Sequence, residues 1–109
     1  MTIMTIKNLG VGQLANSTGD IYTVAASTQA IVKSIVLVNR NTTTEAVNLY
    51  YLKASGTARM LIPKDCALAA GASLEFDTVI TLGAGDKIQG NTTTASKVDY
   101  IISGVEESA

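Results

Sequence analysis

The sequence predicts an all-β protein: an antiparallel β-sandwich, jelly-roll-like, with about eight short strands. Three observations lead to this prediction. Short segments alternate apolar and polar side chains and are rich in Val, Ile, Thr and Tyr, as strands are. Clusters of Gly, Asn, Ser, Thr and Asp separate these segments, as turns do. No segment repeats apolar residues at the spacing of about 3.6 residues that marks an amphipathic helix.

The length of 109 residues fits a single domain. Within it, residues 1–19 are expected to form an N-terminal arm and the first strand, and residues 20–109 the β-sandwich.

Four strands are expected in the first half, at residues 9–14, 20–25, 30–38 and 46–53. Residues 30–38 are apolar on both faces, which predicts a central strand that is covered on both sides along at least part of its length. Residues 39–44 are polar and turn-prone, so the strands on either side of them are expected to form a hairpin.

The second half repeats the pattern with shorter strands at residues 59–62, 73–77, 87–89 and 97–105. The first of these stops at Pro63, which cannot donate a ladder hydrogen bond. Residues 67–71 are compatible with a helical turn, residues 82–86 with a tight turn and residues 91–94 with a polar loop. The core is expected to include the following side chains: Val32, Val36, Val38, Leu49, Leu74, Phe76, Ile88, Tyr100 and Ile102.

Composition excludes several classes of function. Eight basic residues against nine acidic ones give a net charge of -1, so the broad cationic surface that nucleic-acid binding needs is missing. The chain has no His and one Cys, which removes the commonest general base and metal ligand and any intramolecular disulfide. We therefore expect no catalytic, cofactor-binding or metal site, and no enzyme.

Targeting signals are not evident either. Residues 1–7 lack a basic region ahead of an apolar stretch, and the aliphatic run at residues 35–38 is far shorter than the roughly 20 residues that span a bilayer. The expected protein is neither a secretory precursor nor a membrane protein.

Two features of the sequence could indicate a nucleotide-binding or hydrolytic site. The run from Gly10 to Ala15 matches a dinucleotide-binding pattern by letter, but the turn at residues 16–19 follows it where a helix is required, so a glycine-bent strand is expected. Paired acids can hydrolyse substrates without His, yet no spacing singles out a pair. The acids considered are scattered over presumed turns and strand faces: Asp65, Glu75, Asp77, Asp86 and Asp99.

Residues 1–6 repeat the unit Met-Thr-Ile. The repeat places apolar side chains at Met1, Ile3, Met4 and Ile6. These residues form either a frayed end or an arm that docks on a neighbouring subunit. They are the candidate subunit-contact arm.

Three parts of the chain carry a resemblance: residues 21–25 followed by residues 29–40, residues 80–88 around Gly85-Asp86-Lys87-Ile88, and residues 98–106 with Gly104 and Glu106. Together they resemble small β-sandwich virion proteins of tailed bacteriophages, over residues 20–106. The chain departs from that family at Ala25 or Ala26, where the family often has Pro, and in the stretch before Asp20.

The resemblance implies a non-enzymatic structural protein, made in the host cytoplasm and located in the virion. It would decorate and cement the head lattice, or belong to the tail or its fibres. Its implied partners are the major capsid protein or tail proteins and further copies of itself, with a trimer favoured. The low share of charged residues, 16%, fits a domain that covers apolar surface by association.

Two alternatives from other classes stay open. A carbohydrate-binding module needs an exposed aromatic platform, and Tyr50 and Tyr51 point to opposite faces of one strand, so at most one can join it. A small hydrolase needs a convergent acid pair in a cleft.

Overall fold

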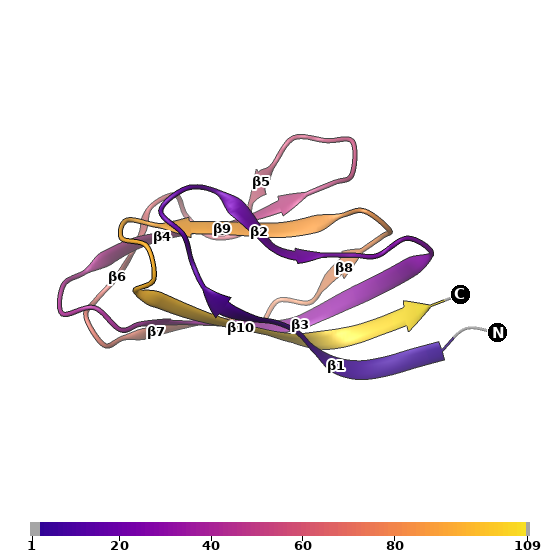
Figure 1. Cartoon of the computed structure of the whole chain (residues 1–109), viewed down its shortest axis with the longest axis horizontal. Helices are drawn as coiled ribbons and strands as arrows, with labels where there is room; N and C mark the ends of the chain where they lie inside the picture. The colour runs from indigo at the N-terminus through magenta and orange to yellow at the C-terminus, as the bar shows by residue number, and fades with distance from the viewer. Residues whose placement is uncertain (1–2, 109) are drawn as a thin grey trace.

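The computed structural model describes residues 3–108, which form ten strands in two antiparallel sheets packed face to face (Figure 1). Sheet A contains β1 (Ile3–Gln13), β10 (Val98–Ser108), β3 (Thr28–Asn39), β7 (Ser73–Phe76) and β8 (Ile80–Leu82). Sheet B contains β2 (Gly19–Thr23), β9 (Lys87–Thr92), β4 (Glu45–Leu52), β5 (Arg59–Met60) and β6 (Cys66–Leu68). The all-β sandwich predicted from the sequence is confirmed.

The topology is that of a jelly roll. Sheet A runs β1-β10-β3 and ends in β7 and β8, which both pair with β3. Sheet B runs β2-β9-β4 and ends in β5 and β6, which both pair with β4. The ten strands therefore occupy eight positions, two of them split, and the first strand lies beside the last. The sequence did not predict β6 and β8, and the helical turn weighed at residues 67–71 is wrong, because Cys66–Leu68 pairs with β4.

The hairpin expected between β3 and β4 is also wrong, since the two strands lie in different sheets. Their connection crosses between the layers and is held by Asn39, which is fully buried. The Asn39 amide donates to the carbonyl oxygens of Thr43 and Leu68, each at 2.9 Å. Alternation of apolar residues identifies strands but does not encode which strands become neighbours, so the sequence could not exclude the hairpin.

A β-bulge in β3 changes which of its side chains face the core. Along β10 the partners step from Gly104 to Ser103, whereas along β3 they step from Val32 to Ser34, so Lys33 is an extra residue. Inward-facing residues are consequently even-numbered up to Val32 and odd-numbered from Ile35 onward. The prediction that Val36 and Val38 belong to the core is wrong: they are half-buried on the opposite face.

The core lies between the two sheets. Four of the predicted core residues are essentially inaccessible: Val32, Leu49, Ile88 and Ile102. Three more are partly buried and pack against the core: Leu74, Phe76 and Tyr100. In β3, Ile35 and Leu37 fill the positions that Val36 and Val38 were expected to fill.

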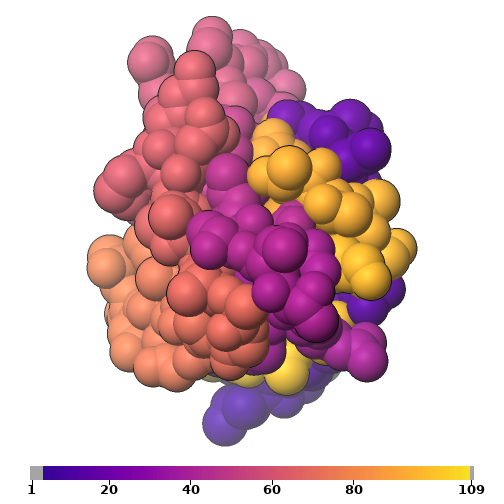
Figure 2. Space-filling model, turned by 90° about the vertical axis from the view of Figure 1, so that its left-hand side faces the viewer, coloured from indigo at the N-terminus to yellow at the C-terminus, as the bar shows by residue number. Residues whose placement is uncertain are grey.

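The end of the sandwich at the left of Figure 1 is closed by hydrogen-bonded loops, and Figure 2 shows that end packed without a wide opening. Its centre is Glu45, which is buried and accepts hydrogen bonds from Thr92 Oγ1 at 2.9 Å, Asn41 Nδ2 at 3.0 Å and the Thr94 amide at 2.8 Å. Burial raises the pKa of this carboxyl, but these donors outweigh it and hold the pKa below its usual value.

The Gly85-Asp86-Lys87-Ile88 turn is built around Asp86, whose side chain is almost entirely buried. Its carboxylate accepts hydrogen bonds from the amides of Gly83 at 2.9 Å and Ala54 at 3.0 Å, and from the Tyr51 hydroxyl at 3.0 Å. Burial raises the pKa of Asp86, yet the donors dominate and lower it to about 2. Asp86 thus joins the β8–β9 turn to β4 and to the residues that follow β4.

Candidate assembly interface

The outer face of sheet A carries several large exposed hydrophobic side chains, and no other part of residues 3–108 forms a layer over it. Of the six large hydrophobic side chains that are exposed among the described residues, four lie on β1 and β10: Met4, Ile6, Val11 and Ile101. Directly opposed residues of antiparallel strands share a face, so the pairing registers place all four on the side away from the core.

Two apolar rows cross this face. In the first, Ile6 lies opposite Val105, which lies opposite Ile31. In the second, Val11 lies opposite Ile101, which lies opposite Val36. The polar row of Asn8, Ser103 and Ser34 separates them.

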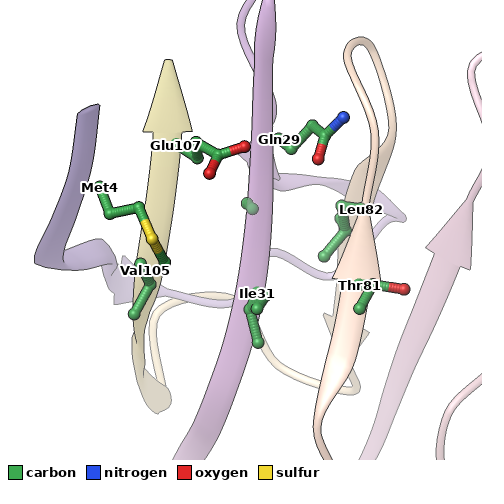
Figure 3. Close-up of a pocket in the computed structure, with 8 residues that line it drawn as sticks. Met4, Gln29, Ile31, Thr81, Leu82, Val105 and Glu107 are labelled. Carbon is green, nitrogen blue, oxygen red and sulfur yellow. The ribbon is translucent and has the colours of Figure 1, made fainter. Parts of the chain in front are cut away.

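A shallow hollow of about 210 Å³ lies on this face where β1, β10, β3 and β8 run side by side (Figure 3). Met4, Ile31 and Val105 contribute apolar surface to it, and Gln29, Thr81 and Glu107 contribute polar groups. A floor that is mainly apolar with polar groups beside it is the composition of many protein contact surfaces.

The inner face at the same end carries an ion pair beside the core. Lys7 Nζ donates to Glu106 Oε1 at 2.9 Å, and the Tyr22 hydroxyl donates to Glu106 Oε2. These hydrogen bonds, with that from Tyr22 foremost, hold the pKa of Glu106 below its usual value, whereas burial first and then Glu106 raise the pKa of Tyr22. At this end, therefore, Met4 and Ile6 point outward while the Lys7–Glu106 pair points inward.

Three residues of the candidate arm, Ile3, Met4 and Ile6, lie in strand β1 of sheet A. Met4 and Ile6 belong to β1, which pairs with β10 from Ile3 to Gln13. Their side chains are exposed, Ile6 to 89%. Ile3 is the first residue of the strand, and Met1 lies outside the described residues.

The acids weighed as a hydrolytic pair are used separately. Asp65 Oδ1 accepts a hydrogen bond from Asn48, and Asp99 Oδ1 accepts one from Gln13. Asp86 accepts one from the Gly83 amide in the β8–β9 turn. Within residues 3–108, no group of three or more Cys, Asp and Glu side chains lies close enough together to hold a metal ion. None of the described segments is a helix long and apolar enough to cross a membrane.

The glycine motif at residues 10–15 is part of a strand, as expected. Gly10 and Gly12 lie in β1, and Ala15 is followed by a bend, not a helix. A Cβ at Gly12 would come within 3.1 Å of the Tyr100 ring carbons, so glycine lets this ring lie against the backbone of β1.

Comparisons with known proteins add the fold but no family. No family model matches the sequence, and a search of curated proteins finds no match. Among solved structures, the chain is similar to a subunit of Bacillus endospore appendages, which form disulfide-linked pili, with a TM-score of 0.58 and 17% identity over 98% of this chain and 88% of that one.

The chain is also similar to a protein of infectious bursal disease virus, Gx strain, with a TM-score of 0.52 and 14% identity over 98% of this chain. It covers only 31% of that viral chain. The Drosophila NLP core, described as forming pentamers and binding histones, gives a TM-score of 0.50 at 17% identity, over 91% of this chain and 98% of that one. These likenesses, at 14–17% identity, establish the β-sandwich fold, which the chain shares with a pilus protein and a viral protein.

The sequence indicated some residues of this candidate interface but not how they come together. The two apolar faces of β3 were visible, but the bulge that decides which face is outer was not. The apolar residues at the N-terminus were visible too, whereas their register on β10, which places Ile6 in one row with Val105 and Ile31, depends on contacts between opposite ends of the chain.

Proposed function

We propose that the protein is a non-enzymatic structural subunit of a bacteriophage virion. In this proposal it is a capsid decoration or cement protein, present in many copies, whose outer face of sheet A lies on the head lattice and stabilises it. A place in the tail or its fibres is the alternative location. Host cytoplasmic synthesis and the trimer favoured from the sequence remain predictions.

One observation carries the proposal: the exposed apolar rows on the outer face of sheet A. Covering such a face with another protein removes it from water, and each large side chain that becomes fully buried contributes about 1.5–3 kcal/mol before ordering costs. The jelly-roll topology and the resemblance over residues 20–106 support placing that partner in a virus particle. The separate engagement of Asp65, Asp86 and Asp99 favours a structural role over hydrolysis.

The experiment replaces Ile101 by Lys and measures how much of the protein is retained on purified particles. Ile101 is 44% exposed at the middle of the second apolar row, so the Ile101→Lys variant folds but brings an unpaired charge to the contact. We expect occupancy, or the apparent affinity for particles that lack the protein, to fall about tenfold or more, which corresponds to ~1.4 kcal/mol.

Met60→Lys is the matched control, because Met60 is 46% exposed and lies in β5 of sheet B. It is expected to bind as the unmodified protein does. Equal binding of both variants would contradict the proposed contact face. Absence of this protein from every preparation of purified particles would contradict its assignment to the virion.

A further inference from the structure

The edge of β1 is the longest unpaired strand edge of the sandwich. β1 has eleven residues and pairs only with β10. The strands at the other sheet edges are short: β2 has five residues, β7 four, β6 and β8 three each and β5 two. An exposed edge presents backbone N–H and C=O groups to any extended segment that can pair with them.

The first part of this edge is regular. Farther along, the register with β10 shifts between Asn8 and Gly10, which marks a β-bulge. Residues 3–7 precede this bulge, and they include two of the three large hydrophobic side chains that are exposed on the strand, Met4 and Ile6. The free edge and the exposed apolar side chains therefore coincide.

We propose that residues 3–7 of β1 pair in antiparallel fashion with the same residues of a second copy, about a two-fold axis at Thr5. The inference deepens the proposed function, on which it rests, by naming one contact between copies. Such pairing would extend sheet A across two molecules. It forms pairs of copies and is compatible with a separate three-fold contact elsewhere on the sandwich.

The register follows from side-chain direction. Opposed residues of an antiparallel pair share a face, so the outward-facing Met4 and Ile6 must meet outward-facing residues of the second copy. With the axis at Thr5, Met4 of each copy lies opposite Ile6 of the other, which brings all four apolar side chains together. With the axis at Ile6, Met4 would lie opposite Asn8. With the axis at Lys7, two like charges would oppose each other.

Charge does not prevent this pairing. An inward-pointing Lys is one of the devices that protect edge strands, but Lys7 is paired with Glu106 at 2.9 Å and in this register does not face its counterpart. The second copy is the occupant favoured because it offers the complementary edge and the same two apolar side chains. A strand of another virion protein is the competing occupant, and the experiment separates the two.

The test is disulfide trapping of the purified full chain in a Cys66→Ala background. A single cysteine bridges two copies only where it lies close to the two-fold axis, since directly opposed Cβ atoms are about 4.5–5.5 Å apart. Thr5→Cys is expected to form a disulfide-linked dimer under mild oxidation about tenfold faster than Thr81→Cys. Thr81 is a matched control: an exposed Thr on strand β8, at the far edge of sheet A.

Two further variants fix the register. Met4→Cys and Ile6→Cys should cross-link more slowly than Thr5→Cys, because they lie off the axis. Adding Met4→Lys to Thr5→Cys should slow trapping, because the charge would face Ile6 of the second copy. Met4 is an exposed side chain, so this change leaves the fold intact.

The outcomes are distinct. Trapping of Thr5→Cys no faster than Thr81→Cys overturns the pairing and leaves the edge to another protein. Fastest trapping at Met4→Cys or Ile6→Cys overturns the register. The trapping assay uses the isolated protein, whereas the Ile101→Lys experiment uses particles. Either result can therefore contradict its own proposal without contradicting the other.

Discussion

At the residue scale, the polar side chains inside the sandwich hold loops together. Asp86, Glu45 and Asn39 are each nearly inaccessible, and each bonds to segments distant in sequence. Buried carboxylates are stable only when several donors satisfy them, and both acids have such donors. These contacts show what the buried acids do in the fold, and the absence of an active site stays a prediction from composition.

The low pKa of Asp86 predicts that the free energy of unfolding decreases in acid. A carboxyl whose pKa is lower in the folded state stabilises the fold above its unfolded pKa of 3.8, and this contribution is lost as the pH falls toward the folded value of about 2. Asp86→Asn should therefore lower the free energy of unfolding at pH 7 by about 1–2 kcal/mol and flatten its dependence on pH between 4 and 2.

Urea unfolding as a function of pH measures this effect. Asp77→Asn, an exposed acid between β7 and β8, serves as the control and should behave like the unmodified protein. If the free energy of unfolding of Asp86→Asn depends on pH as strongly as that of the unmodified protein, other carboxylates cause this dependence.

At the element scale, the strands were largely predictable and their pairing was not. Alternation located seven of the eight positions of the jelly roll to within a few residues, because each strand has one buried face. The exception is β1, which begins at Ile3, six residues before the strand expected at residues 9–14. The segments that were missed, β6 and β8, have only three residues each, too few to display alternation. The hairpin and the faces of β3 were wrong because Asn39 and the bulge at Lys33 act through contacts remote in sequence.

The bulge itself depends on Gly104. A Cβ at this position would overlap the carbonyl oxygen of Ile31 in the neighbouring strand, which is backbone and cannot turn aside. We expect Gly104→Ala to destabilise the fold by about 1–3 kcal/mol, as overpacking does. Gly19→Ala in β2 is the control, because a Cβ there would have its nearest contact at 3.9 Å. Equal stability of the two variants by urea unfolding would show that the bulge accommodates a methyl group.

At the scale of the whole molecule, the two ends of the sandwich differ. One end is sealed by the hydrogen bonds of Glu45 and Asn39, while at the other the described ends of β1 and β10 lie side by side (Figure 1). The outward-facing apolar side chains Met4 and Ile6 and the open edge of β1 lie at this second end. The asymmetry fits a subunit that presents one face and one edge to its neighbours and leaves the sealed end free.

The contact on the outer face of sheet A is tested most directly by a cryo-electron microscopy reconstruction of the particle that carries the protein. We expect density from another protein over this face, with Ile101 and Val36 in the contact. A reconstruction in which that face is bare, while sheet B or the loops around Glu45 form the contact, would contradict it.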